Sequence, residues 1–112
     1  MKVIDFTEQQ IKDFVEHKRP KDKVVRDQLD IGYKYDGRSL EIQEIRPQWD
    51  DSSIIHQYPI AKATFVKSKK IWKLYWKRAS GKWEPYTPMP EIKSIQEVLQ
   101  AIGDDTHHCF WG

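Results

Sequence analysis

Basic and aromatic side chains are concentrated in residues 60–83, a stretch that contains no aspartate or glutamate. Its basic residues are Lys62, Lys67, Lys69, Lys70, Lys73, Lys77, Arg78 and Lys82, and its aromatic residues are Phe65, Trp72, Tyr75, Trp76 and Trp83. Ammonium groups neutralise phosphates, and aromatic rings stack on nucleobases. The stretch therefore suits an anionic partner, and single-stranded nucleic acid in particular.

The same stretch alternates with a period of two between turn residues, which predicts antiparallel hairpins. Two-residue turns at Ser68–Lys69 and Ser80–Gly81 would sort its side chains onto two faces of a sheet. One face carries the candidate ligand-binding residues Lys62, Lys73, Tyr75, Lys77 and Tyr86. The other carries Trp72, Leu74, Trp76 and Trp83, which we expect to be buried. The lysine-bearing face is also consistent with an ordinary solvated face of a one-sided sheet.

A second group of chemically active side chains lies near the C-terminus, at Asp105, His107, His108 and Cys109. Thiolate and imidazole are ligands that zinc prefers. Their nearly contiguous spacing argues against a metal site, because neighbouring residues of an extended segment point in opposite directions. The alternative is a polar C-terminal cap in which Cys109 packs as a small apolar residue.

Carboxylates at Glu41, Glu44, Asp50 and Asp51, with His56 nearby, could in principle perform acid–base chemistry or bind Mg²⁺. No nucleophile elbow, phosphate-binding loop or metal-binding helix motif accompanies them. A solvated loop explains them more simply. We therefore favour a protein without catalytic activity and expect no cofactor.

The composition narrows the class of protein. A chain of 112 residues is expected to form a single domain, residues 1–112, and its net charge of +2 means that any basic feature is a local patch. No apolar run is long enough to span a membrane. The single cysteine excludes an intrachain disulfide, and residues 1–5 do not resemble a secretory leader. A cytoplasmic location is the expectation.

The remaining elements follow from capping and turn signals. A helix is predicted from Thr7 to about Lys18, and a second over 95–102, capped by Ser94 and ended by Gly103. Two strands near residues 29–35 and 40–46 are joined by a predicted turn at Asp36–Gly37. We expect residues 48–59 to form a long loop with Trp49, Ile54, Ile55 and Tyr58 tucked down as anchors. The predicted fold is α+β: a five-stranded antiparallel meander with an N-terminal and a C-terminal helix packed on one face, in the order α-β-β-β-β-β-α.

Several segments also resemble a family of small bacterial proteins known as a domain of unknown function. They are Glu44–Pro47, Ile60–Lys62, Trp72–Trp76, Trp83 with Tyr86, and the ending from Asp105 to Gly112. The resemblance covers about residues 40–112, and its most specific parts are the Trp-x-Leu-Tyr-Trp strand and the Cys-Phe-x-Gly ending. Trp111 departs from the phenylalanine expected there. The family supplies no catalytic residue, but the resemblance implies that the C-terminal tail belongs to the fold.

Three hypotheses follow for function. The first is a binding module whose lysine-bearing face takes an anionic ligand such as single-stranded nucleic acid. The second is a protein–protein interaction module or homodimer that joins through the sheet face or an edge strand. The third, and the least favoured, is a metal-dependent enzyme built on the C-terminal cluster.

Overall fold

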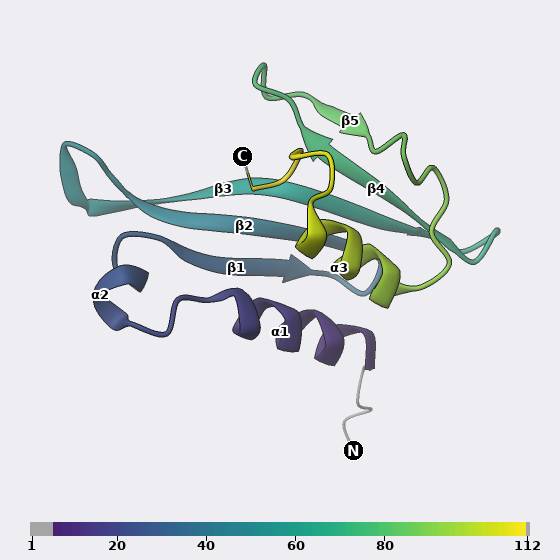
Figure 1. Ribbon diagram of the computed structural model, residues 1–112, viewed down its shortest axis with the longest axis horizontal. Helices are drawn as coiled ribbons and strands as arrows, with labels where there is room; N and C mark the ends of the chain where they lie inside the picture. The colour runs from purple at the N-terminus through teal and green to yellow at the C-terminus, as the bar shows by residue number, and fades with distance from the viewer. Residues whose placement is uncertain (1–5, 112) are drawn as a thin grey trace.

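A computed structural model describes residues 6–111, and its architecture confirms the predicted fold class. The elements are α1 (Phe6–Lys18), α2 (Lys23–Arg26), β1 (Asp30–Tyr35), β2 (Ser39–Gln48), β3 (Asp51–Val66), β4 (Ile71–Lys77), β5 (Trp83–Pro85) and α3 (Ile95–Asp104). The strands form one antiparallel sheet in the order β1-β2-β3-β4-β5, with α3 lying across it and α1 alongside β1 (Figure 1). Residues 1–5, where no leader is expected, and Gly112 of the predicted ending lie outside the described residues.

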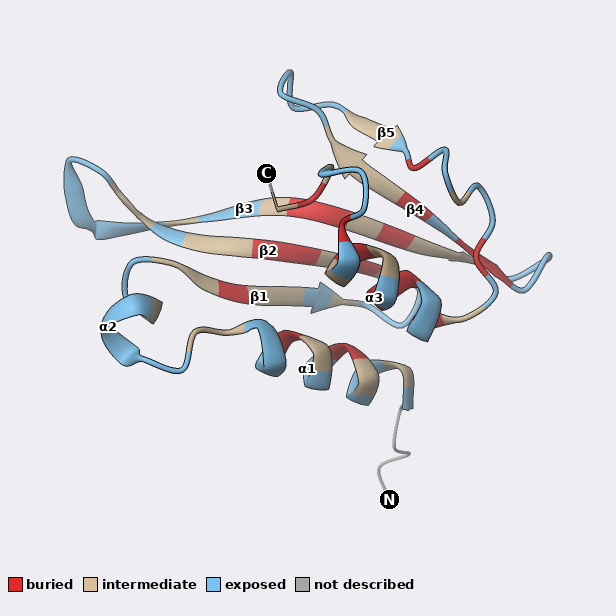
Figure 2. Ribbon diagram, viewed as in Figure 1, coloured by how far each residue is buried: buried red, intermediate tan, exposed pale blue. Residues whose placement is uncertain are grey.

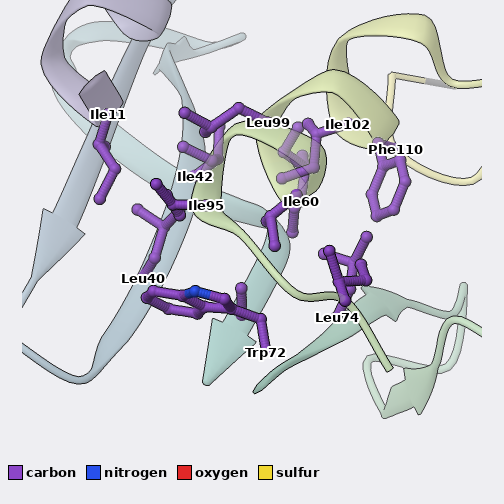
Figure 3. Close-up of a cluster of buried hydrophobic side chains, with 14 of the residues drawn as sticks. Ile11, Leu40, Ile42, Ile60, Trp72, Leu74, Ile95, Leu99, Ile102 and Phe110 are labelled. Carbon is purple, nitrogen blue, oxygen red and sulfur yellow. The ribbon is translucent and has the colours of Figure 1, made fainter. Parts of the chain in front are cut away.

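The core lies between the helices and one face of the sheet. Its buried side chains come from α1, α3, the central strands and the C-terminal tail, with Ile11, Leu40, Ile102 and Phe110 among the labelled residues of Figure 3. Figure 2 shows buried residues in the middle of the strands and exposed residues along the outer sides of the helices. No helix within residues 6–111 is long and apolar enough to cross a bilayer.

The C-terminal helix is positioned by a cap and by a glycine. The Ser94 hydroxyl accepts a hydrogen bond from the backbone N–H of Glu97 at 3.1 Å, as the capping signal predicts. The helix continues past the predicted end at Gly103, because Asp105 takes the left-handed conformation instead, with φ of 44°. A Cβ at Gly103 would lie 3.3 Å from the Phe14 ring, so glycine lets α3 approach α1 closely.

The hairpin of β3 and β4 has the predicted register. Phe65 pairs with Trp72 and Ala63 with Leu74, so small side chains oppose large ones across the core face. Trp72 and Leu74 are buried, whereas Trp76 is only half-buried at the margin of the core.

The turn between β1 and β2 differs from the prediction by one position. The two central residues are Gly37 and Arg38 rather than Asp36 and Gly37, and Gly37 supplies the positive φ of 94°. The Asp36 carboxylate accepts hydrogen bonds from the backbone N–H groups of Arg38 and Ser39, which holds the turn. The register therefore shifts by two residues, and an even shift keeps every side chain on its predicted face.

The turn between β4 and β5 is one residue longer than predicted, and this changes which β5 side chains face the core. It has three residues, with Arg78 N–H donating to Lys82 C=O at 2.8 Å and Gly81 at φ of 88°. The register shifts by one residue, so Lys77 pairs with Trp83 and Tyr75 with Pro85. A register shift by an odd number of residues moves each side chain of β5 to the other face of the sheet. The prediction that Trp83 is buried and Tyr86 exposed is therefore wrong.

The predicted loop at residues 48–59 is also wrong, because most of it forms strand. Beyond the end of β4, strands β2 and β3 continue as an extension, which we call the arm (residues 46–59). The arm is two-stranded beyond the end of β1, where Arg46 pairs with His56. Pro47 lies past the end of β1, and Pro59 lies past the end of β4 beside a bulge at Ile60, so neither proline interrupts a ladder on its outer side. The predicted anchors are exposed instead, by 94% for Trp49 and 56% for Ile55.

We predict that Trp72→Ala lowers the free energy of unfolding by about 3–5 kcal/mol, because it removes a large buried ring and leaves a cavity. Trp72 is 6% exposed and lies 5.3 Å from the Phe65 ring between centroids. Trp49→Ala is the matched control and should change stability by less than about 0.5 kcal/mol. Urea unfolding followed by circular dichroism tests both, and equal effects would show that the core is assigned to the wrong face.

Candidate functional site

The face of the sheet opposite the helices carries four of the five predicted ligand-binding residues. Lys73, Tyr75 and Lys77 alternate along β4, and Lys62 of β3 pairs directly with Tyr75. Trp83 joins them from β5, opposite Lys77. We call these five residues the lysine face.

The charges of the lysine face are held against its rings. The Lys62 Nζ lies 5.0 Å from the Tyr75 ring centroid and 5.2 Å from that of Trp83, and the Lys77 Nζ lies 5.6 Å from the Trp83 centroid. Such cation–π contacts fix the position of a charge that would otherwise be mobile. Tyr75, Trp83 and both lysines are half-buried, whereas Lys73 is exposed. Two strands, β3 and β4, therefore present positive charges beside partly accessible rings of β4 and β5.

Glu41 borders the lysine face on the β2 side. Glu41 pairs with Lys62 from β2, and its Oε1 accepts a hydrogen bond from the buried side chain of Gln43 at 2.8 Å. Glu84 lies 3.4 Å from the Arg78 guanidinium. Glu84 pairs with Trp76, so it lies on the core side of the sheet, whereas Lys34 of β1 pairs with Glu41 and adds a further basic residue to the open face.

A hollow of about 250 Å³ adjoins the lysine face at the outer edge of β4, lined by Lys73, Leu74, Tyr75, Pro85, Tyr86, Thr87 and Pro90. The chain creates it by leaving the strand and returning. Tyr86 N–H donates to Leu74 C=O at 2.8 Å, and Ile92 then exchanges two hydrogen bonds with Trp72. Residues between them bow away from β4 and leave the space beside Lys73.

Tyr86 does not belong to the lysine face. It is 4% exposed, and its ring packs 5.3 Å from Phe110 and 6.0 Å from His107 between centroids. Burial raises the pKa of its phenol, and the charges at Cys109 and Asp105 raise it further. Trp83 takes the place predicted for Tyr86. The sequence signal for this exchange is Gly81 at the third position of the turn, where a left-handed residue closes a three-residue loop.

The four C-terminal candidate ligands do not converge on a metal site. The buried Asp105 carboxylate accepts hydrogen bonds from the backbone N–H groups of Cys109, Phe110 and Trp111, at 2.7, 3.0 and 3.0 Å. His107 and His108 are exposed. Within residues 6–111, no three His, Cys, Asp or Glu side chains are grouped to hold a metal ion. Asp105 therefore organises the C-terminal tail, which agrees with the expectation that the tail belongs to the fold.

The other carboxylates are likewise dispersed along the sheet and the arm. Glu44 pairs with Arg46 at 2.8 Å, Asp50 accepts from Gln48 at 2.6 Å, and Asp51 accepts from the Ser53 hydroxyl at 2.6 Å. These local contacts stabilise strands and the turn, and they do not assemble into an acid–base pair.

The fold and its open face define an α+β protein with a one-sided antiparallel sheet and a localised basic and aromatic surface. The chain belongs to the family described as Domain of unknown function (DUF3024), whose family model matches residues 3–112. Comparison with curated proteins gave no match, and neither did comparison with solved structures.

We predict that Asp105→Ala destabilises the protein by about 3 kcal/mol or more, because three backbone N–H groups lose a charged acceptor. Burial and the Asp105 charge both raise the pKa of the Cys109 thiol. The same variant should therefore speed labelling of Cys109 by a maleimide at neutral pH, where the native thiol reacts slowly.

Asp104→Ala is the matched control. Asp104 is exposed, and its carboxylate accepts a hydrogen bond from the exposed Gln100 amide at 2.9 Å. It should change neither stability nor labelling appreciably. Equal effects of the two substitutions in urea unfolding would show that Asp105 does not hold the tail.

Proposed function

We propose that the chain is a cytoplasmic bacterial binding module, without catalytic activity, that takes single-stranded nucleic acid on its lysine face. The observation that carries the proposal is the cation–π arrangement of Lys62 and Lys77 against Tyr75 and Trp83 on the uncovered face. A phosphate backbone meets charges whose positions are already fixed, so less side-chain entropy is lost on binding.

The spacing of the lysine face suits an extended polyanion. Lys73 and Lys77 are four residues apart on β4, so they lie about 13 Å from each other along the strand. Lys62 lies on the neighbouring strand, beside Tyr75. The three ammonium groups therefore surround an aromatic centre. Bases can stack on accessible parts of the rings while phosphates contact the lysines.

The adjacent hollow gives the face a place for one flat ring. Its walls include the Tyr75 ring and the side chains of Pro85 and Pro90, and Lys73 lies at its rim. A nucleobase placed there would leave its phosphate near an exposed ammonium group. Glu41 of β2, which pairs with Lys62, would weaken contact with a polyanion on that side of the face.

We predict that the protein binds mixed-sequence single-stranded oligonucleotides at low salt. Three lysine–phosphate contacts give a slope of about −2 for log affinity against log salt. Tyr75→Ala should lose about 1–3 kcal/mol of binding energy through lost stacking. Lys73→Glu should weaken binding and flatten the slope. Fluorescence anisotropy at two salt concentrations measures all three effects.

Lys12→Glu on α1 is the control, because it makes the same change of charge at an exposed site away from the lysine face. It should bind almost as tightly as the unmodified chain. Absence of binding at low salt would refute the proposal, and so would an equal loss from Lys12→Glu and Lys73→Glu. Circular dichroism of each variant establishes that the fold is retained.

A further inference from the structure

The arm projects from the sheet with an unpaired edge. β4 pairs with β3 from Ala61 onward, so within residues 6–111 no strand neighbours the β4 side of β3 from Asp51 to Pro59 (Figure 1). On the other side of the arm, β2 continues past the end of β1 for three residues, Arg46 to Gln48. An isolated two-stranded ribbon is only marginally stable in water.

The two edges of the arm differ in how well they are protected against pairing with another strand. The β2 edge carries Arg46 and Pro47, a charge and a residue without an N–H, which are the usual devices that prevent strand pairing. The β3 edge has no Lys, Arg, Asp or Glu from Ser52 to Tyr58. Its large apolar side chains are exposed, by 41% for Ile54, 56% for Ile55 and 48% for Tyr58. This edge has the composition of a strand that is paired.

We propose that two copies of the chain pair antiparallel through the β3 edges of their arms, forming a two-fold symmetric dimer. A two-fold axis that relates antiparallel neighbours runs perpendicular to the sheet, so each face continues into the same face of the second copy. Full overlap places Asp51 of one copy beside Pro59 of the other. Each arm tip then reaches the end of β4 in the second copy.

The charges of the arm tip and of the turn after β4 are complementary, which indicates that the strand pairing with this edge belongs to a second copy of the chain. The tip carries Asp50 and Asp51, both exposed, and the turn after β4 carries Arg78 and Lys82, also exposed. Figure 1 shows this turn beyond the end of β4, away from β3. The symmetric pairing brings each acidic tip to a basic turn, and it does so twice in one dimer.

The regular part of the edge is short, which explains why the charged contacts are needed. Pro47 pairs with Ile55, whereas Gln48 pairs with Asp51, so residues 52–54 bulge out of the ladder near the tip. In the full overlap, residues 55–59 of one copy lie opposite residues 51–55 of the other, so regular strand pairing is limited to the region around Ile55 on the two-fold axis. Pairing of these residues alone would be weak, and the two tip-to-turn contacts fix its register.

Sedimentation equilibrium of the full chain, at low salt and without nucleic acid, tests the proposal. The unmodified chain should be dimeric at micromolar concentration. The double variant Asp50→Lys, Asp51→Lys reverses the charge of the tip, and the double variant Arg78→Glu, Lys82→Glu reverses the charge of the turn. Each double variant should raise the dimer dissociation constant at least tenfold, because like charges then face each other.

A mixture of the tip-reversed and turn-reversed chains should recover a dimer, since each tip then meets a turn of opposite charge in the other chain. Ile55→Lys should yield a monomer through its effect on the edge, whereas Val24→Lys, at another exposed apolar residue on α2, should leave the dimer intact. A monomeric unmodified chain would overturn the proposal. Double variants that each dimerise normally, or a mixture that stays monomeric, would overturn it equally.

Discussion

The two faces of β4 are the constraint on which the rest of the structure depends. Trp72 and Leu74 point into the core, so the residues between and beyond them, Lys73, Tyr75 and Lys77, must point the other way. Burial of large rings on one face therefore places cations and a ring on the other. The helices cover the apolar face because it is the only one whose removal from water is favourable. The candidate binding surface is a direct consequence of how the core is packed.

The loop after β4 shows how a local feature controls what the open face can do. With a two-residue turn, Tyr86 would lie on the lysine face and Trp83 in the core. The three-residue loop exchanges them, so the larger indole contacts Lys62 and Lys77, and Tyr86 packs against the C-terminal tail. The exchange also joins the tail to the sheet. One residue of loop length therefore changes both the surface chemistry and the anchoring of the C-terminus.

The arm and the lysine face are separate features of one sheet. The first depends on β3 being longer than its neighbours, and the second on where β4 and β5 run beside it. A dimer joined through the arms would keep both lysine faces on the same side of a continuous sheet, because its two-fold axis is perpendicular to the strands' plane. The proposed self-association would therefore extend the candidate binding surface without covering it.

The sequence by itself determined the order of the strands, helices α1 and α3, the face of Leu40 and Ile42, and the grouping of Lys62 with Tyr75. These follow from periodicity and from turns whose predicted register was correct or differed by an even number of residues. The short helix α2 was not predicted. Only the tertiary structure decided the faces of Trp83 and Tyr86, because an odd loop reverses alternation and several turn types fit the same residues. It also decided that residues 51–59 are strand. The aspartates and serines at residues 50–53 favour a loop, and the pairing of the following residues with β2 is a non-local interaction that no local pattern encodes.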